Sequence, residues 1–127
     1  MSKLLRVLII EDSEDDAELL AIALERGGYQ VTHQRVDTKE DMQAALSKSQ
    51  SWDIVLADYS MPQFSAIAAL EILKEQELDL PFVFVSGKIG EDTAVAAMKA
   101  GAHDYLVKGQ LSRLLPAVER ELREAVL

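Results

Sequence analysis

The stretch VLIIEDSEDD, residues 7–16, joins an apolar run directly to a cluster of acids. Its first four residues are apolar without alternation, as in a strand of a parallel sheet that helices cover on both faces. The six residues that follow hold five carboxylates: Glu11, Asp12, Glu14, Asp15 and Asp16. Because like charges repel, a buried strand that ends in such a cluster indicates a cation-binding site at its end.

The whole chain has the size and composition of one globular domain. It has 127 residues, of which 49% are hydrophobic and 28% charged, and its net charge is −9. We expect residues 1–127 to form one domain around one core. An acidic chain lacks the basic face that nucleic acids require, and no run of residues is long enough for a signal peptide or a membrane span. With no cysteine there is no thiolate metal site. We therefore expect a cytoplasmic protein whose partners include neither nucleic acid nor membrane.

Strand-like and helix-like segments alternate along the sequence. Strands are predicted at residues 4–10, 30–36, 53–57, 82–85 and 105–107. Helices are predicted at residues 15–26, 38–49, 66–76, 91–100 and 112–127. Repeated strand–helix–strand units predict an α/β fold, in which a five-stranded parallel sheet carries helices on both faces.

Reactive side chains stand where four of the predicted strands end. They are Glu11 and Asp12, Asp58, Ser86 and Lys108. In an open parallel sheet the site lies outside the carboxyl ends of the strands, so these groups should converge. Clustered carboxylates suit Mg²⁺, and a metal with a lysine beside a carboxylate suits phosphoryl transfer. Asp58, at the end of the third and central strand, is the natural nucleophile.

The other three acids of the opening stretch have a simpler interpretation. Glu14, Asp15 and Asp16 fall at the start of the first helix, where negative charge favours the helix dipole. We interpret them as helix-terminus residues without a chemical role. The same turn has no glycine-rich phosphate cradle, which argues against a P-loop or a dinucleotide fingerprint.

Four motifs in order carry a resemblance that covers nearly the whole chain. They are VLIIEDSEDD, DIVLADYSMPQFSA, PFVFVSGK and AGAHDYLVKG. Together they resemble the receiver domain of two-component response regulators. The resemblance implies a doubly wound, flavodoxin-like receiver fold of strand order 2-1-3-4-5. It also implies a signalling switch, not an enzyme in the ordinary sense, that takes a phosphoryl group from a sensor histidine kinase or a histidine phosphotransfer protein with Mg²⁺ as cofactor.

The resemblance implies a role for each matching residue. Asp58 looks like the phosphoacceptor and Lys108 like the lysine that contacts the phosphoryl group. Asp12, Glu11 (through water) and the backbone carbonyl of Ser60 look like the metal ligands beside Asp58. Ser86 and Tyr105 look like the switch pair, in which the ring turns inward as the hydroxyl moves. For Tyr105, a static aromatic residue at the sheet edge is an equal alternative.

Three positions depart from the pattern of the family. Glu11 stands where aspartate is commoner, which lengthens that arm. Ala66 stands where glycine is usual, so that the loop lacks a residue free to adopt positive φ, and Ser65 is expected to cap the helix instead. Gly109 replaces a common proline, which predicts a looser loop after Lys108. None of these changes removes a reactive group.

Several other residues are interpreted as structural. Trp52, Met42, Met61 and Met98 should fill the core, and neither His33 nor His103 fits an exposed phosphohistidine. Four charged residues of the last helix should form a solvated face: Glu119, Arg120, Glu121 and Arg123. A minority interpretation makes the fourth helix, fifth strand and fifth helix a homodimer or output-partner surface.

Two other functions compete with a phosphorylated receiver. The first is a receiver-like module that binds partners without phosphorylation, which the complete residue set disfavours. The second is a phosphatase of the haloacid dehalogenase type with Asp58 as nucleophile. That family has an acid two residues after the nucleophile, and here the residue is Ser60.

Overall fold

A computed structural model describes residues 3–47, 52–59, 61, 63–78, 80–87 and 91–126. The strands are β1 (Lys3–Ile10), β2 (Tyr29–Val36), β3 (Ile54–Asp58), β4 (Phe82–Ser86) and β5 (Asp104–Val107). The helices are α1 (Glu14–Arg26), α2 (Lys39–Ser47), α3 (Ala66–Glu75), α4 (Glu91–Lys99) and α5 (Leu114–Val126). A 3₁₀ helix, η1 (Lys108–Arg113), precedes α5. All ten predicted elements are present.

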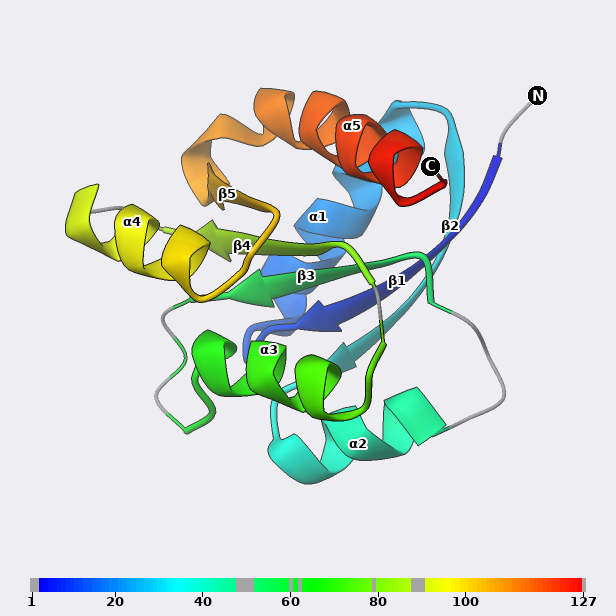
Figure 1. Ribbon diagram of the computed structural model, residues 1–127. Coiled ribbons are helices and arrows are strands. Elements are labelled where there is room, and N and C mark those ends of the chain that lie inside the picture. Colours follow the sequence, from blue (N-terminus) through cyan, green and yellow to red (C-terminus); the bar gives the residue numbers. More distant parts are fainter. Residues whose placement is uncertain are drawn as a thin grey trace.

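The five strands form one parallel sheet in the order β2-β1-β3-β4-β5 (Figure 1). This confirms the expected fold class and strand order. From β1 the chain goes to β2 at one edge of the sheet, and it then returns to β3 on the other side of β1 and continues to β4 and β5. The direction of strand addition therefore reverses between β1 and β3. In such sheets the crevice outside the carboxyl ends at this reversal is where ligands bind.

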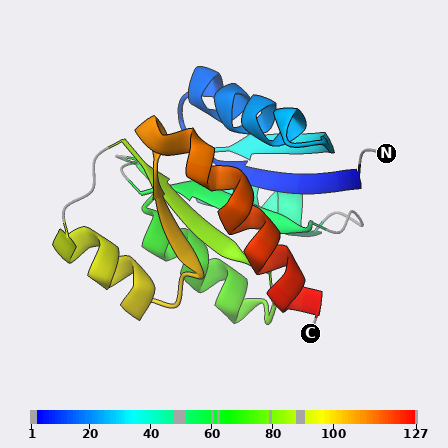
Figure 2. The same ribbon diagram turned by 90° about the horizontal axis from the view of Figure 1, so that it is seen from above.

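Helices cover both faces of the sheet, as Figures 1 and 2 show. Alternate residues of each central strand point to opposite faces, which produces two separate cores. Leu8, Val55 and Phe84 belong to the core under α2, α3 and α4. Ile9, Leu56 and Val85 belong to the core under α1 and α5. The central strands are therefore apolar on both faces because both faces are buried.

Local sequence accounts for the helix boundaries near the predicted site. Ser13 caps α1 and Ser65 caps α3, each through its hydroxyl, which accepts a backbone N–H bond from the residue three positions on. Ser65 thus has the capping role that we expected once Ala66 replaced glycine. At the other end of α1, Gly28 adopts a φ of 100°, which favours glycine.

Three expectations about single residues were wrong. Met98 is 46% exposed on α4 and does not fill the core, whereas Met42 and Met61 are buried. Glu121 is only 4% exposed, so it does not belong to the solvated face of α5. The residues after Lys108 form the helix η1 and not a loose loop. Trp52 is buried as expected, and its indole N–H donates to the backbone oxygen of Ala45.

No helix within the described ranges combines the length and the apolar character needed to cross a bilayer.

Candidate phosphoryl and metal site

The register of the sheet brings the strand ends level. Ile10 pairs with Ala57, so the residues that follow them, Glu11 and Asp58, stand side by side. Asp58 in turn pairs with Val85, the residue before Ser86. The last residue of β5, Val107, pairs with Ser86 and is followed by Lys108. The predicted site residues therefore meet at one edge because the hydrogen-bond ladder places them there.

Three carboxylates come together at this edge. One oxygen from each of Glu11, Asp12 and Asp58 lies within 4.8 Å of the others. Glu11 is 1% exposed and Asp58 7% exposed, whereas Asp12 is open to solvent. Beside Asp12 lies a cavity of about 240 Å³, also lined by Asp37, Met61 and Gln63. The site is thus half sheltered, with one acid and a cavity facing solvent.

Burial raises the pKa of the Glu11 carboxyl from 4.5 to about 7. The Lys108 ammonium and the backbone N–H of Ser13 lower this pKa, while Asp12 and Asp58 raise it. The Ser13 N–H donates to Glu11 Oε1 at 3.1 Å, and Oε2 faces Lys108 in an ion pair without ordinary hydrogen-bond geometry. Glu11 is thus a buried acid that its neighbours neutralise only in part.

Lys108 extends its ammonium into the acid cluster. Its Nζ lies 2.7 Å from Glu11 Oε2, 2.7 Å from Asp16 Oδ2 and 3.3 Å from Asp58 Oδ2. Burial lowers the pKa of Lys108, but the hydrogen bond to Asp16 and the ion pair with Glu11 outweigh it, and the pKa is raised. Lys108 is therefore charged at neutral pH, and its ammonium could contact the oxygen atoms of a group attached to Asp58.

The sequence predicts no role for Asp16 beyond the helix terminus. Asp16 lies in the first turn of α1, as predicted, and its carboxylate also binds Lys108. The position of Asp16 relative to the buried residues of α1 could have predicted that its side chain lies near the site. Asp16 stands next to Ala17 and one turn before Leu20, at the border of the buried face of α1. Glu14 and Asp15 are exposed, in agreement with their interpretation.

Ser86 and Tyr105 lie on β4 and β5, and both are buried. The Tyr105 ring packs inward, 6.0 Å from the ring centre of Tyr59 and 6.2 Å from that of Phe84. Its hydroxyl makes no hydrogen bond of ordinary geometry with the described part of the chain. Burial raises the pKa of Tyr105, and the nearby Ser86 hydroxyl lowers it in part. Tyr105 is thus buried on the edge strand β5 with its ring packed inward.

The donor set fits a hard divalent cation. Mg²⁺ takes one or two carboxylates and keeps several waters, and here three carboxylates converge beside an open cavity. Burial raises the pKa of the Glu11 carboxyl, and a bound cation would favour its charged form. The expected ligand Ser60 lies outside the described residues.

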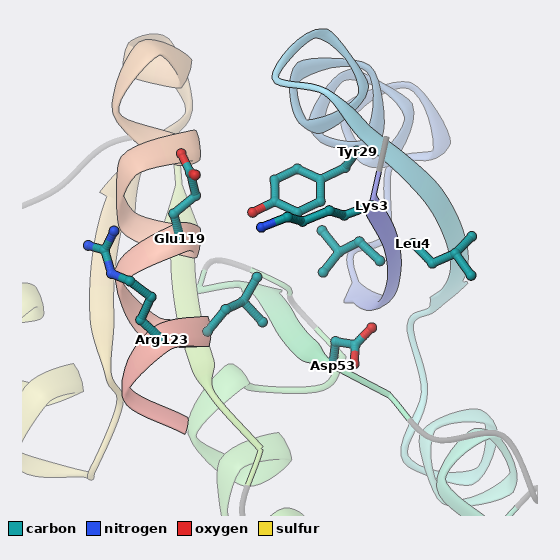
Figure 3. A pocket seen from close by; sticks show the side chains of 8 residues that line it. Lys3, Leu4, Tyr29, Asp53, Glu119 and Arg123 are labelled. Carbon is teal, nitrogen blue, oxygen red and sulfur yellow. The ribbon is translucent and has the colours of Figure 1, made fainter. Parts of the chain in front are cut away.

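A second cavity, of about 650 Å³, opens at the opposite end of the sheet. Lys3 and Tyr29, at the amino ends of β1 and β2, reach side by side toward α5, which carries Glu119 and Arg123 (Figure 3). The described residues that line this cavity include none of the predicted site residues. The acid cluster is therefore not part of this larger cavity.

Comparison with known proteins agrees with the geometry. The profile of the response regulator receiver domain matches residues 7–119. The response regulator SaeR of Staphylococcus epidermidis is 31% identical over 102 residues, which are 80% of this chain and 43% of SaeR. The chain thus spans less than half the length of this curated relative.

Solved structures give the same result. The signal receiver domain of a signal transduction histidine kinase from Syntrophus aciditrophicus is 30% identical, with a TM-score of 0.76, and the match covers 94% of this chain and 90% of that one. Full-length FixJ from B. japonicum is 29% identical, with a TM-score of 0.82, and the match covers 98% and 60% of the two chains. The chain belongs to the response regulator receiver domain family, the signalling switches of two-component systems.

Proposed function

We propose that this receiver is phosphorylated on Asp58 by a phosphohistidine of a sensor kinase or a histidine phosphotransfer protein. The observation that carries this proposal is the position of the Asp58 carboxylate. It stands among Glu11 and Asp12, and the Lys108 ammonium lies 3.3 Å away. A positive group beside a carboxylate nucleophile neutralises the charge that an incoming phosphoryl group brings.

In the proposed transfer, an oxygen of Asp58 forms a bond to phosphorus as the bond from phosphorus to the donor imidazole breaks. The electron pair of that bond stays on the imidazole nitrogen. After proton exchange with water, the histidine side chain of the donor is a neutral imidazole. Lys108 then donates to a phosphoryl oxygen, and Glu11 and Asp12 would hold the cation that offsets the added negative charge.

Mg²⁺ is the proposed cofactor of this site. Asp12, Asp58 and the backbone carbonyl of Ser60 would hold it directly, and Glu11 would act through water. When bound, the ion supplies positive charge to the phosphoryl oxygens. Its absence leaves the carboxylates to repel an anionic donor, so transfer is expected to depend on the metal.

The proposal is tested with acetyl phosphate, which transfers its phosphoryl group and releases acetate. With Mg²⁺ present, the protein is expected to gain the mass of one phosphoryl group, because the metal and Lys108 make Asp58 accessible to an anion. Removal of Mg²⁺ with a chelator should suppress the gain. Intact mass spectrometry checks both results, and an unchanged mass with Mg²⁺ present would contradict phosphorylation.

We also propose that Ser86 and Tyr105 report the phosphoryl group to the rest of the domain. The inward ring packs beside Ser86, which stands one register step from Asp58. A bound phosphoryl group would draw the Ser86 hydroxyl toward Asp58 and favour the inward ring. Such a switch requires that the two ring positions differ in affinity for the phosphoryl group.

The switch predicts a change at Tyr105 when a phosphoryl mimic binds. Fluorotyrosine spectra should show two ring environments in the free protein and mainly one with beryllofluoride and Mg²⁺. In Ser86→Ala the mimic should shift the populations less, because the hydroxyl that couples the two sites is absent. Identical Tyr105 spectra with and without the mimic would contradict the switch, and they would not affect the proposal that Asp58 accepts the phosphoryl group.

The remaining assignments are proposals of the same kind. We propose that residues 1–127 form one receiver domain that acts in the cytoplasm. We further propose a homodimer through α4, β5 and α5, supported by Val95 and Met98, which are 47% and 46% exposed on α4. Sedimentation with and without acetyl phosphate tests this dimer, and a monomer in both conditions would exclude it.

A further inference from the structure

Lys108 contacts one carboxylate more than the proposed transfer uses. Glu11 and Asp58 belong to the proposed site, but Asp16 comes from the first turn of α1. The Lys108 ammonium donates hydrogen bonds to Asp16 and Asp58 and forms a close ion pair with Glu11, so three carboxylates share one positive charge. The contact to Asp58, at 3.3 Å, is the longest of the three.

The three carboxylates differ in how they meet solvent. The side chain of Glu11 is 1% exposed and that of Asp58 is 8% exposed, whereas that of Asp16 is 39% exposed. Asp16 therefore holds the ammonium toward the rim of the crevice, and Asp58 lies deeper. Water can replace Lys108 at Asp16, so this contact is the easiest of the three to give up.

We propose that Asp16 is a positioning residue that competes with Asp58 for Lys108 and thereby slows phosphorylation. This inference rests on the proposed function, since it concerns the rate of the same transfer. An incoming phosphoryl group needs contact with the Lys108 ammonium, and the Asp16 charge holds this ammonium closer to Asp16 than to Asp58. Without the Asp16 charge, Glu11 and Asp58 are the remaining ion-pair partners of Lys108, and both draw the ammonium into the crevice.

The test compares initial rates of labelling by acetyl phosphate in saturating Mg²⁺ at low ionic strength. Asp16→Asn should label roughly two- to fivefold faster than the wild type, which corresponds to one partly exposed ion pair. Added salt should reduce this difference, because it screens exposed charges. Asp16→Glu keeps the charge and should stay closer to the wild-type rate.

Two comparisons separate this role from a general effect of charge. Asp15→Asn removes the same charge from the same helical turn at an exposed position and should leave the rate unchanged. In a Lys108→Met background, Asp16→Asn should have no effect, because the residue through which it acts is gone. An equal acceleration in that background, or an unchanged or lower rate in Asp16→Asn alone, would overturn the inference.

Denaturant unfolding of the same four proteins, without metal or phosphodonor, tests the contact itself. The wild type, Asp16→Asn, Lys108→Met and the double variant should show a coupling of about two- to fivefold in the unfolding equilibrium constant. Absence of coupling would contradict the inference even if labelling succeeds. Failure of the wild type to label would instead contradict the proposed function, and the unfolding cycle would still decide whether Asp16 holds Lys108.

Discussion

Replacement of Asp58 by asparagine is expected to abolish phosphoryl incorporation from acetyl phosphate. The amide that replaces the carboxylate is a poor nucleophile and loses the negative charge that faces Lys108 at 3.3 Å. Its size is nearly unchanged, so the strand end should keep its geometry. Intact mass spectrometry after incubation with donor and Mg²⁺ measures the outcome, and circular dichroism verifies that the variant is folded.

Asp53→Asn is the matched control for this experiment. Asp53 precedes the amino end of the same strand, where its carboxylate accepts the backbone N–H of Arg6 at 2.8 Å. It lies at the opposite end of the sheet from the acid cluster, so labelling should equal that of the wild type. Label that persists in Asp58→Asn would assign the acceptor to another residue.

Mg²⁺ affinity is expected to depend on pH through Glu11. Because burial raises the pKa of this carboxyl to about 7, the metal must displace a proton from it below that pH. Affinity should fall by about tenfold between pH 8 and pH 6, as one displaced proton requires. Calorimetric titration at the two pH values measures this change.

Glu11→Gln is the control for the pH dependence. The amide cannot ionise, so its Mg²⁺ affinity should be weaker at pH 8 and should change little between pH 8 and pH 6. Equal wild-type affinities at both values would show that Glu11 does not titrate in this range. Such a result would remove Glu11 from the proposed metal site or place its pKa far from 7.

The raised pKa of Glu11 also determines how the free energy of unfolding changes with pH. The folded state favours the protonated carboxyl, so the metal-free protein binds more protons folded than unfolded. This contribution to stability is complete below pH 4.5 and is lost as the pH rises to about 7. The loss is at most about 3 kcal/mol, and bound Mg²⁺ should offset it.

Most of the fold could be predicted because the pattern of apolar residues in the sequence matches the faces that are buried in the structure. The apolar runs 7–10, 54–57 and 82–85 are buried on both faces, which in a parallel sheet requires helices on both sides. The ends of those runs fixed the positions of Glu11, Asp58 and Ser86. A site built at strand ends is readable from sequence once the strands are correctly bounded.

Side-chain contacts between distant elements could not be predicted in the same way. Asp16 and Lys108 are separated by 92 positions, and their contact depends on how α1 packs beside η1. The burial of Glu121 had a signal in helix phase, since it lies three and four residues after the buried Val118 and Ala117. Residue type argued against burial there, because glutamate is rarely buried.

Location of the phosphoryl group in the labelled protein tests the central claim most directly. Borohydride reduces an aspartyl phosphate to homoserine, which marks the modified position in peptide mass spectra. After labelling with acetyl phosphate and Mg²⁺, the account predicts homoserine at position 58 alone. Homoserine at another position, or an unmodified Asp58 in a protein that has gained a phosphoryl group, would contradict it.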